Sequence, residues 1–272
     1  MNLVSIISPD DPRIEDYVSV RERDLTGRDG KFIVEGKVTL DIFLRQSRFE
    51  VVSLFLESGR LEPLAQLFQH VPPDVPIYTA DQALMDQIAG FPIHRGILAC
   101  GRKTEPTGLS SFLRSIPEAS TLVLCVGLSN HDNVGAVFRN AAALGAQGVI
   151  LDQESCDPLY RKSIRVSAGT ALWLPFHHGG TAHDILNGLK EAGYDIWALT
   201  PGKDAMNLYQ KPRPSKLCLV LGPEGPGLPQ AIIDVAEPVV IPMSEGVDSL
   251  NVATSLAVAL SWRLSGADGH GN

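Results

Sequence analysis

Five continuous apolar runs in the second half of the chain restrict its fold more than any other feature of the sequence. They are TLVLCVGL (121–128), GVILDQ (148–153), YDIWALT (194–200), KLCLVLG (216–222) and PVVIPM (238–243). A strand with one solvent-facing side alternates apolar and polar residues, whereas a continuous run indicates burial on both faces. Both faces are buried in parallel sheets whose strands are joined by helices. The sequence therefore predicts a parallel α/β sheet for this part of the chain.

Helices are expected between most of these strands. One is expected to open at Asn133, another to cover DPLYRKSIRVSAG (157–169), and a last one to run from about Asn251 to Leu264. In parallel α/β sheets, ligands bind beyond the carboxyl ends of the strands. The functional edge is therefore expected to consist of the loops 128–133, 200–215, 222–229 and 243–251.

The first part of the chain mixes strand-like and helix-like patterns, which predicts a separate, small α/β domain. We expect a strand that passes into an amphipathic helix over 32–46, and further strands at VVSLFLES (51–58), VPIYTA (75–80) and GILACG (96–101). The segment that follows contains Pro, Gly and Ser, which is typical of a linker. The predicted organisation is a front domain over 1–104, a linker over 105–117 and a second domain over 118–272.

The net charge of −8 argues against nonspecific nucleic-acid binding as the main function. Phosphate affinity depends on where Lys and Arg cluster, so a local basic face is compatible with this balance. Two segments are candidates, RKSIR (161–165) and PGKDAMNLYQKPRPSK (201–216), and each equally fits a solvated surface. Near the start of the front domain the basic signal is weak, because acids offset the cations Arg21, Arg23, Arg28 and Lys31.

The cysteines and the beginning of the sequence indicate the compartment. The four cysteines form no CxxC pair, and Cys100, Cys125 and Cys218 lie in apolar strand-like runs, which predicts reduced, buried thiols. The start, MNLVSIISPDDPRIED, lacks the basic segment of a signal peptide. No apolar run approaches the ~20 residues of a membrane-spanning helix. We therefore expect a cytoplasmic protein without a membrane partner.

The segment NVGAVFRNAAALG (133–145) places one arginine, Arg139, among small and apolar residues. Asn133 is a suitable N-cap for the helix that this segment predicts. A stripe of apolar residues is expected to pack on the sheet, and Arg139 lies on a face of small residues. Helical side chains lean toward the N-terminus, so the guanidinium is expected to reach toward Asn133. It then needs an anionic partner, which is either a ligand phosphate or a neighbouring acid in a structural salt bridge.

A second motif, LVLGPEGPGLP (219–229), joins a strand to a glycine-rich loop. No Gly-Lys-Ser/Thr follows, so it is not a Walker loop, and its glycine spacing does not fit dinucleotide binding. Glycines let a ligand approach the backbone, and Glu224 is an acid held among them. A plain turn is the alternative interpretation.

A third motif, IPMSEGVDSLNVATSLAVAL (241–260), runs from a strand end into a helix. Ser249 or Asn251 is the expected cap of this helix. A helix N-terminus directed at the sheet edge is a suitable site for an anion or a carboxylate. Taken alone, the motif is better explained as an ordinary helix cap with a packing leucine.

Together, the order and spacing of these motifs resemble those of the SpoU/TrmH branch of the SPOUT methyltransferases. The family's first motif, Asn-x-Gly-x-x-x-Arg-Asn/Thr-Ala, is matched by Asn133, Gly135, Arg139, Asn140 and Ala141. Its glycine loop is matched by Gly222, Glu224, Gly225, Gly227 and Leu228. Its third motif is matched by Ile241 to Met243 and Ser249 to Val252. The resemblance covers about 118–266 and includes SAG at 167–169.

The resemblance extends more loosely to the front domain. FIVEG (32–36) and His94-Arg95-Gly96 resemble the small ribosomal-protein-like RNA-binding domain of many family members. Two departures affect loops beside the motifs. Glu245 stands where many relatives have glycine, and His131-Asp132 replaces the more usual Pro-x before Asn133.

The resemblance implies a deep trefoil knot, with the chain threading near 222–251, and an obligate homodimer. It also implies S-adenosylmethionine as cofactor and methyl transfer to a ribose 2′-hydroxyl of rRNA or tRNA. Backbone groups around five residues would hold the cofactor: Thr200, Gly222, Ile241, Met243 and Leu250. The residues implied in catalysis are Arg139, Asn133, Glu224, Ser249 and Asn251. Of these, Glu224 would anchor the glycine loop or a residue across the dimer, while Ser249 and Asn251 would contact RNA or support Arg139.

The implied reaction poses a chemical question about Arg139. The methyl donor is already activated, so the protein has to position the hydroxyl and remove its proton. The family assigns the base role to this arginine, yet an ordinary arginine does not accept a proton near neutrality. Either its environment deprotonates it transiently, or it orients the ribose while the proton leaves otherwise. We expect Asn133 and an RNA phosphate to fix the guanidinium against the 2′-oxygen.

Three rival interpretations differ in testable ways. A Rossmann-type oxidoreductase requires a Gly-x-Gly-x-x-Gly turn, which CVGLSNHDNVG does not supply. A catalytically silent RNA-binding member would keep the fold, although every reactive position of the family is present here. A metal hydrolase would have to use His177 and His178, but adjacent residues on a strand point to opposite faces. We therefore expect no metal site.

Overall fold

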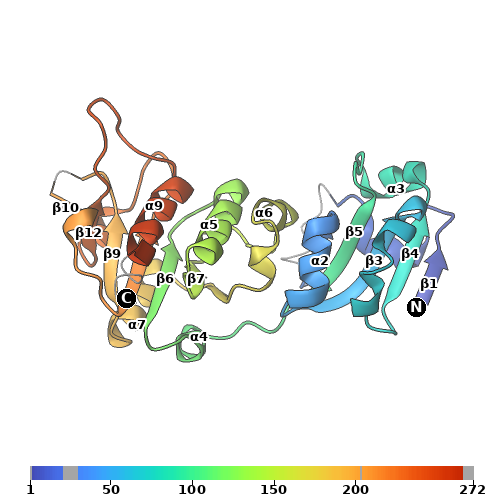
Figure 1. Ribbon diagram of the computed structural model, residues 1–272, viewed down its shortest axis with the longest axis horizontal. Coiled ribbons are helices and arrows are strands. Elements are labelled where there is room, and N and C mark those ends of the chain that lie inside the picture. The colour runs from blue at the N-terminus through green and yellow to red at the C-terminus, as the bar shows by residue number, and fades with distance from the viewer. Residues whose placement is uncertain (1, 21–29, 203, 266–272) are drawn as a thin grey trace. The chain divides into compact units, whose positions relative to one another are not determined.

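The computed structural model describes residues 2–20, 30–202 and 204–265 and divides the chain into two compact units (Figure 1). The first unit comprises Met1–Glu105 and Pro158–Trp173, and the second comprises Pro106–Asp157 and Leu174–Asn272. Within the predicted second domain, 118–272, the segment Pro158–Trp173 groups with the first unit by its contacts. The predicted cations Arg21, Arg23 and Arg28 lie outside the described residues, as does the end of the 118–272 segment.

A mixed five-stranded sheet forms the centre of the first unit. In spatial order, its strands are β1 (Asn2–Ser5), β4 (Pro76–Ala80), β3 (Glu50–Glu57), β5 (Ile97–Arg102) and β2 (Lys31–Glu35). Strands β1, β4 and β3 run parallel, while β5 is antiparallel to both β3 and β2. The structure thereby confirms the strands expected near 32, 51–58, 75–80 and 96–101, and it adds β1.

Over its described residues, the first unit contains the α-helices α2 (Lys37–Gln46), α3 (Gln82–Ala89) and α6 (Arg161–Val166). Helix α6 is shorter than the helix expected over 157–169, because the chain turns at Ala168 and Gly169 with positive φ. A Cβ at Gly169 would lie 3.1 Å from Ile42, so the backbone after α6 packs closely on α2. The N–H of Arg48 also donates to the carbonyl of Leu172 at 3.3 Å. These contacts explain why 158–173 groups with the front of the chain.

A parallel seven-stranded sheet forms the second unit, as the apolar runs predicted. Its spatial order is β10 (Met206–Asn207), β12 (Glu237–Val240), β9 (Asp195–Leu199), β11 (Lys216–Leu221), β6 (Ser120–Cys125), β7 (Gly148–Leu151) and β8 (Phe176–His178). All neighbouring pairs are parallel. The five predicted strands are confirmed. The two additional strands, β8 and β10, are the edge strands.

Helices cover both faces of this sheet, which accounts for its continuous apolar strands. Helices α4 (Leu109–Ser115), α7 (Ala182–Glu191) and α8 (Gln230–Ile233) contribute to one buried cluster with the sheet. Helices α5 (His131–Ala143) and α9 (Val252–Ser265) pack against each other and the sheet (Figure 1). Helix α4 lies within the segment expected to be a linker, and its Phe112 is buried in the core. Short 3₁₀ helices occupy Pro12–Tyr17, Ser58–Arg60, Glu62–Leu64, Phe68–His70, Thr170–Leu172 and Leu208–Gln210.

The strand order brings together the ends of β12, β9 and β11. After β9 the chain reaches the far edge at β10, returns past β9 to form β11, and then comes back to β9 as β12. Since these strands are parallel, the loops that follow them leave from the same edge of the sheet. The loops come from distant parts of the sequence, and they form the wall of the site described next.

Candidate functional site

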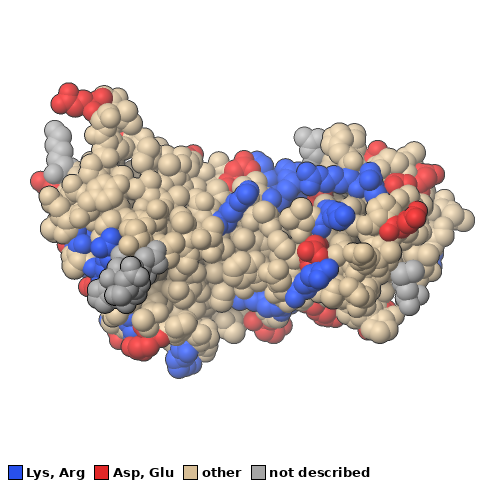
Figure 2. All heavy atoms as spheres, viewed as in Figure 1, with Lys and Arg blue, Asp and Glu red and all other residues tan. Residues whose placement is uncertain are grey.

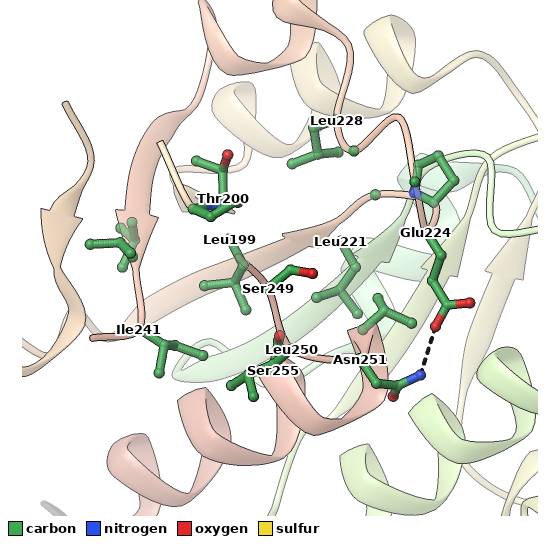
Figure 3. Close-up of a pocket in the computed structure, with 18 of the residues that line it drawn as sticks. Leu199, Thr200, Leu221, Glu224, Leu228, Ile241, Ser249, Leu250, Asn251 and Ser255 are labelled. Atoms are coloured by element: carbon green, nitrogen blue, oxygen red, sulfur yellow. Dashed lines mark hydrogen bonds between the residues drawn. The ribbon is translucent and has the colours of Figure 1, made fainter. Parts of the chain in front are cut away.

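A cavity of about 440 Å³ lies at the carboxyl ends of β9, β11 and β12 (Figure 3). Its walls come from the loop after β9, the glycine loop after β11, and the segment that joins β12 to α9. The wall is mainly apolar, with polar side chains at Thr200, Glu224, Ser249, Asn251 and Ser255. Ligand sites are typically apolar cavities of this size with a small number of polar groups. The cavity therefore has the volume and lining expected of a small-molecule site.

The glycine loop closes tightly because position 222 has no side chain. A Cβ at Gly222 would lie 2.7 Å from the backbone nitrogen of Leu228, closer than real Cβ contacts allow. Gly225 and Gly227 have φ values of +87° and +69°, which favour glycine. Leu228 is buried and packs into the core of the unit. The second motif is thus a tight turn, as its alternative interpretation held, and this turn is also a wall of the cavity.

The residues predicted to hold a cofactor all line this cavity: Thr200, Gly222, Ile241, Met243 and Leu250. Glu224, Ser249 and Asn251, predicted for catalysis, line it as well. Asn133 and Arg139 do not belong to the wall. The structure therefore brings eight of the ten predicted positions to one cavity, while their roles stay predictions.

The side chain of Asn251 connects all three sequence motifs. Its Nδ2 donates to Oε1 of Glu224 at 2.7 Å and to Oδ1 of Asn133 at 3.1 Å (the bond to Glu224 is drawn in Figure 3). Its Oδ1 accepts from the backbone N–H groups of Ala253 at 2.9 Å and Thr254 at 3.3 Å, which confirms Asn251 as the cap of α9. Both atoms of the amide are therefore used, one to begin α9 and the other to join the glycine loop to α5.

The structure corrects the predicted role of Asn133 as a helix cap. Helix α5 begins at His131, and its cap is Asn130, whose side chain accepts from the N–H of Asp132 at 2.9 Å. Asn133 lies in the first turn, only 6% exposed, and accepts from Asn251. Within the described part of the chain, no hydrogen bond joins Asn133 to Arg139. Asn133 therefore joins α5 to the third motif. The contact that we expected between Asn133 and the Arg139 guanidinium is not formed.

Arg139 is exposed on α5. Over the described residues it has no ion pair and no hydrogen bond, so the alternative of a structural salt bridge finds no partner. It follows Asn133 by six residues, which corresponds to about 9 Å along the helix and a rotation of about 120°. Next to it, Asn140 donates to the carbonyl of Ala253 at 2.8 Å and ties α5 to the first turn of α9. The packing stripe on the other side of α5, expected from the sequence, is fully buried.

A buried acid that the sequence analysis did not single out supports the loop before α5. Asp152, directly after β7, is 3% exposed and accepts from the N–H of Gly127 at 3.0 Å and from the hydroxyl of Ser155 at 2.7 Å. The same hydroxyl oxygen accepts from the N–H of Leu128 at 2.9 Å. The position of Asp152 directly after a predicted buried strand was the sequence signal that could have identified it. Ser255, in the first turn of α9, is a further cavity residue that pattern reasoning missed.

The residues proposed for other chemistry do not form a second site. A nitrogen of the His177 ring lies 3.0 Å from the carbonyl of Thr107, and one of His178 lies 3.0 Å from that of Ser155. Among the described residues, no three His, Cys, Asp or Glu side chains come together as metal ligands. Burial of the free thiols of Cys100, Cys125 and Cys218 is confirmed. No helix in the described part of the chain is long and apolar enough to cross a membrane.

Comparison with known proteins agrees with this geometry. The model of the SpoU rRNA methylase family matches residues 120–261, slightly more than half of the chain. The chain belongs to the SpoU rRNA methylase family. It is 35% identical over 97% of its length to an uncharacterized tRNA/rRNA methyltransferase of Mycobacterium tuberculosis, 92% of which is covered. The 23S rRNA (guanosine-2′-O-)-methyltransferase RlmB of Escherichia coli is 28% identical over 75% of the chain and 84% of RlmB.

The fold has counterparts among solved structures. An AdoMet-bound rRNA methyltransferase from Sinorhizobium meliloti superposes with a TM-score of 0.80 at 19% sequence identity, covering 96% of this chain and 97% of that one. At this identity, the similarity is evidence of a shared fold. The predicted α/β architecture, with a parallel sheet in the second part and a smaller α/β unit in front, is confirmed.

Proposed function

We propose that this protein transfers a methyl group from S-adenosylmethionine to a ribose 2′-hydroxyl of rRNA or tRNA. The observation that carries the proposal is the cavity whose walls come from two family motifs and which Asn251 connects to the third, on α5. The E. coli relative is a guanosine-2′-O-methyltransferase, which supports the ribose hydroxyl as acceptor. The Mycobacterium relative is named for tRNA and rRNA, so both RNA classes are candidates.

The cavity suits S-adenosylmethionine in size and lining. Exposed backbone groups at the ends of three parallel strands can accept and donate hydrogen bonds to a polar ligand, and leucine and isoleucine side chains can pack on an adenine ring. The related protein from S. meliloti was solved with this cofactor bound, which supports the same ligand here. When bound, the cofactor supplies a methyl group on a sulfonium, which is already activated for transfer. Thr200, Gly222, Ile241, Met243 and Leu250 would hold it.

Side chains around the cavity would position the loops, contact the RNA and stabilise the reacting oxygen. The Asn251–Glu224 hydrogen bond holds the glycine loop and the start of α9 in one geometry. Ser249 lies on the exposed segment before α9, where its hydroxyl can contact RNA. Arg139 is assigned to the substrate: a free guanidinium binds a phosphate or stabilises a 2′-oxygen as its negative charge develops. In this assignment, the arginine acts as a fixed cation, and the proton need not pass through it.

The implied homodimer has support in the surface of α9. A shallow hollow on this helix is lined by Leu144, Tyr209, Thr254, Ala257, Val258, Ser261, Trp262 and Ser265. Tyr209 is 58% exposed, and Met206 and Leu264 are also exposed large hydrophobics of the same unit. Asn251, a residue of the cavity wall, caps α9, so a second copy on this face would also stabilise the wall. We propose a homodimer through α9. We also propose the trefoil knot near 222–251 that the resemblance implies, and a cytoplasmic location.

Methyl transfer to purified RNA tests the proposed function. The protein is incubated with S-adenosylmethionine labelled in its methyl group and with protein-free rRNA or unmodified tRNA, and the RNA is digested to nucleosides. We expect label in a 2′-O-methylnucleoside. Label in a base would contradict ribose as the acceptor. RNA binding without any label would favour the catalytically silent alternative. Mapping of 2′-O-methyl positions in cells with and without the gene would then identify the nucleotide.

A further inference from the structure

Asp152 is the least exposed charged residue in the described part of the chain, at 3%. Acidic side chains ordinarily lie at the surface, as they do on the face shown in Figure 2. Asp152 follows β7 directly, and among the described residues no Lys, Arg or His forms an ion pair with it. Burial of a carboxylate costs free energy unless hydrogen bonds replace the lost water. The position of this acid therefore requires an explanation.

Three donors from two loops compensate for the buried charge. The N–H of Gly127 donates to both carboxylate oxygens of Asp152, at 3.0 Å and 3.1 Å. Ser155 donates twice to Oδ1, from its N–H at 2.9 Å and from its hydroxyl at 2.7 Å. A carboxylate has about four acceptor sites, whereas an amide oxygen has two lone pairs. An asparagine at this position would therefore leave one of the three donors unpaired.

Ser155 extends the network to the next residue of the loop after β6. It is 5% exposed, and its side-chain oxygen accepts from the N–H of Leu128 at 2.9 Å. The N–H of Cys156 also donates to the carbonyl of Leu128 at 3.0 Å. The turn after β7 thus fixes two consecutive residues, Gly127 and Leu128, at the carboxyl ends of the strands.

The loop after β6 contacts the glycine loop of the cavity. The N–H of Val126 donates at 2.9 Å to the carbonyl of Leu221, which directly precedes Gly222. Gly127 has a φ of +61°, and a Cβ there would lie 3.9 Å from Cγ of Pro223. The buried acid therefore fixes a loop that lies directly against the cavity wall.

The same loop leads into α5, which carries Arg139. Its next residues reach Asn130, the cap of this helix. Asn133 and Asn140 join α5 to α9 through hydrogen bonds. Asp152 acts on the other side, because it fixes the residues before the helix to the ends of β6 and β7, which lie beside α5 in Figure 1.

We propose that Asp152 is a positioning residue for methyl transfer, which places Arg139 by fixing the loop that begins α5. This inference rests on the proposed function. The glycine loop has two further supports, the tight closure at Gly222 and the bond from Asn251 to Glu224, so the cofactor site keeps its shape without the acid. A displacement of reacting groups by about 1 Å costs about 100-fold in rate. Loss of the network should therefore slow transfer and leave cofactor affinity unchanged.

Two variants and a matched control test this assignment. D152N keeps the shape of the side chain and leaves one donor unpaired. S155A keeps the acid and its bond to the loop, so it is the milder change if D152N does not fold. The control S120A removes a buried hydroxyl at the opposite end of β6, which bonds to that of Tyr194 at 2.7 Å. Ser120 is as buried as Ser155, so S120A and S155A should lower the midpoint of urea unfolding to a similar degree.

The rate of methyl transfer separates positioning from stability. Transfer by the full-length proteins to protein-free rRNA and unmodified tRNA is measured in a single turnover, with enzyme and S-adenosylmethionine in excess. We expect D152N and S155A to be at least about tenfold slower than the unchanged protein, and S120A to stay within about twofold. Calorimetry should show the same affinity for S-adenosylmethionine in all four proteins.

A double substitution links the loss of rate to Arg139. If Asp152 acts by placing the arginine, R139A should slow the D152N protein less than it slows the unchanged protein, because the guanidinium is already displaced. Residues that act independently would instead give fold-changes that multiply in D152N/R139A.

Three results would overturn the inference: D152N and S155A as fast as S120A, fold-changes that multiply in the double variant, or a loss of cofactor affinity as large as the loss of rate. The last result would mean that the acid shapes the cavity itself. In each case, transfer by the unchanged protein still supports the proposed function. Absence of transfer by the unchanged protein would refute the proposed function, and the inference with it.

Discussion

The amide nitrogen of Asn251 donates a 2.7 Å hydrogen bond to Oε1 of Glu224, across 27 residues of sequence. The same nitrogen reaches Asn133, so the glycine loop, the start of α9 and the first turn of α5 have one common support. A hydrogen bond to a charged acceptor is stronger than one between neutral groups. The Asn251 Oδ1 atom caps α9, and its Nδ2 atom holds the glycine loop and α5. A substitution that keeps one atom and loses the other can therefore separate the two roles.

Replacing Asn251 by Asp should lower cofactor affinity more than it lowers stability. An aspartate still caps α9, because its oxygens accept from Ala253 and Thr254. It cannot donate to Asn133 or Glu224, and it places a second carboxylate against Glu224. We expect an N251D protein with nearly unchanged thermal unfolding and about tenfold weaker binding of S-adenosylmethionine by calorimetry, about 1.4 kcal/mol.

N251A provides the matched comparison, since it removes the cap as well. Its free energy of unfolding should fall by about 1 kcal/mol, the usual cost of a lost N-cap. If N251D binds the cofactor as tightly as the unchanged protein, the link between Asn251 and Glu224 does not shape the cavity.

A methyl group at position 222 should disrupt the cavity wall. In G222A the new Cβ would lie 2.7 Å from the Leu228 nitrogen and 2.9 Å from its Cγ, so the loop has to move. Overpacking of this kind costs about 1–3 kcal/mol. We expect at least tenfold weaker cofactor binding. In the control G202A, the Cβ would make an ordinary contact of 3.8 Å with Thr200, and φ is not positive. Equal loss in both variants would contradict the steric explanation.

The sheet of the second unit could be predicted because five of its strands are long, apolar and separated by helices. Edge strands β8 and β10 have three and two residues, too few to carry a periodic pattern. The cap of α5 was misplaced because the sequence offers Asn130 and Asn133 within one turn. Only the side-chain contacts show that Asn130 caps the helix while Asn133 turns inward to Asn251.

The cavity residues were predicted through resemblance, since spacing alone does not show which loops meet. The convergence follows from the order β12-β9-β11, in which neighbours in space are not neighbours in sequence. The packing of segment 158–173 on the first unit could not be predicted from spacing either. The sequence showed its helical pattern, but its packing on α2 depends on the contact of Gly169 with Ile42. Contacts between distant segments leave no periodic trace in a single sequence.

The thiols give a prediction for alkaline pH. Burial raises the pKa of Cys156 to about 11, and burial also raises the pKa of the Cys125 and Cys218 thiols. The thiolate is the reactive form, so the folded protein should react slowly with iodoacetamide at pH 8 and react at all four cysteines after unfolding in urea. Fast labelling of Cys125 or Cys218 in the folded protein would contradict their burial.

The raised pKa of Cys156 also determines whether the free energy of unfolding rises or falls with pH. Above pH 9, the ordinary pKa of a thiol, the unfolded chain releases protons that the folded chain keeps. The stability due to Cys156 is therefore complete below pH 9 and is lost as the pH rises toward about 11. Urea unfolding at pH 8 and pH 10, with a reductant present, should show a smaller fall in the free energy of unfolding for C156S than for the unchanged protein.

Substitution of Arg139 should separate catalysis from cofactor binding. Arg139 does not line the cavity, so R139A should bind S-adenosylmethionine with unchanged affinity in calorimetry. Loss of a positioned cation that stabilises developing charge costs about 10²–10³ in rate. We therefore expect methyl transfer by R139A to fall by at least about 100-fold under saturating RNA and cofactor.

R139K distinguishes charge from geometry at this position. Lysine keeps the positive charge but lacks the planar pair of donors that a phosphate or a ribose oxygen can engage together. If Arg139 acts as a fixed cation with directed donors, R139K should retain part of the activity that R139A loses, and its rate should stay well below that of the unchanged protein. Full activity in R139A would remove Arg139 from the mechanism. Loss of cofactor binding in either variant would mean that α5 supports the cavity through this residue as well as through Asn133.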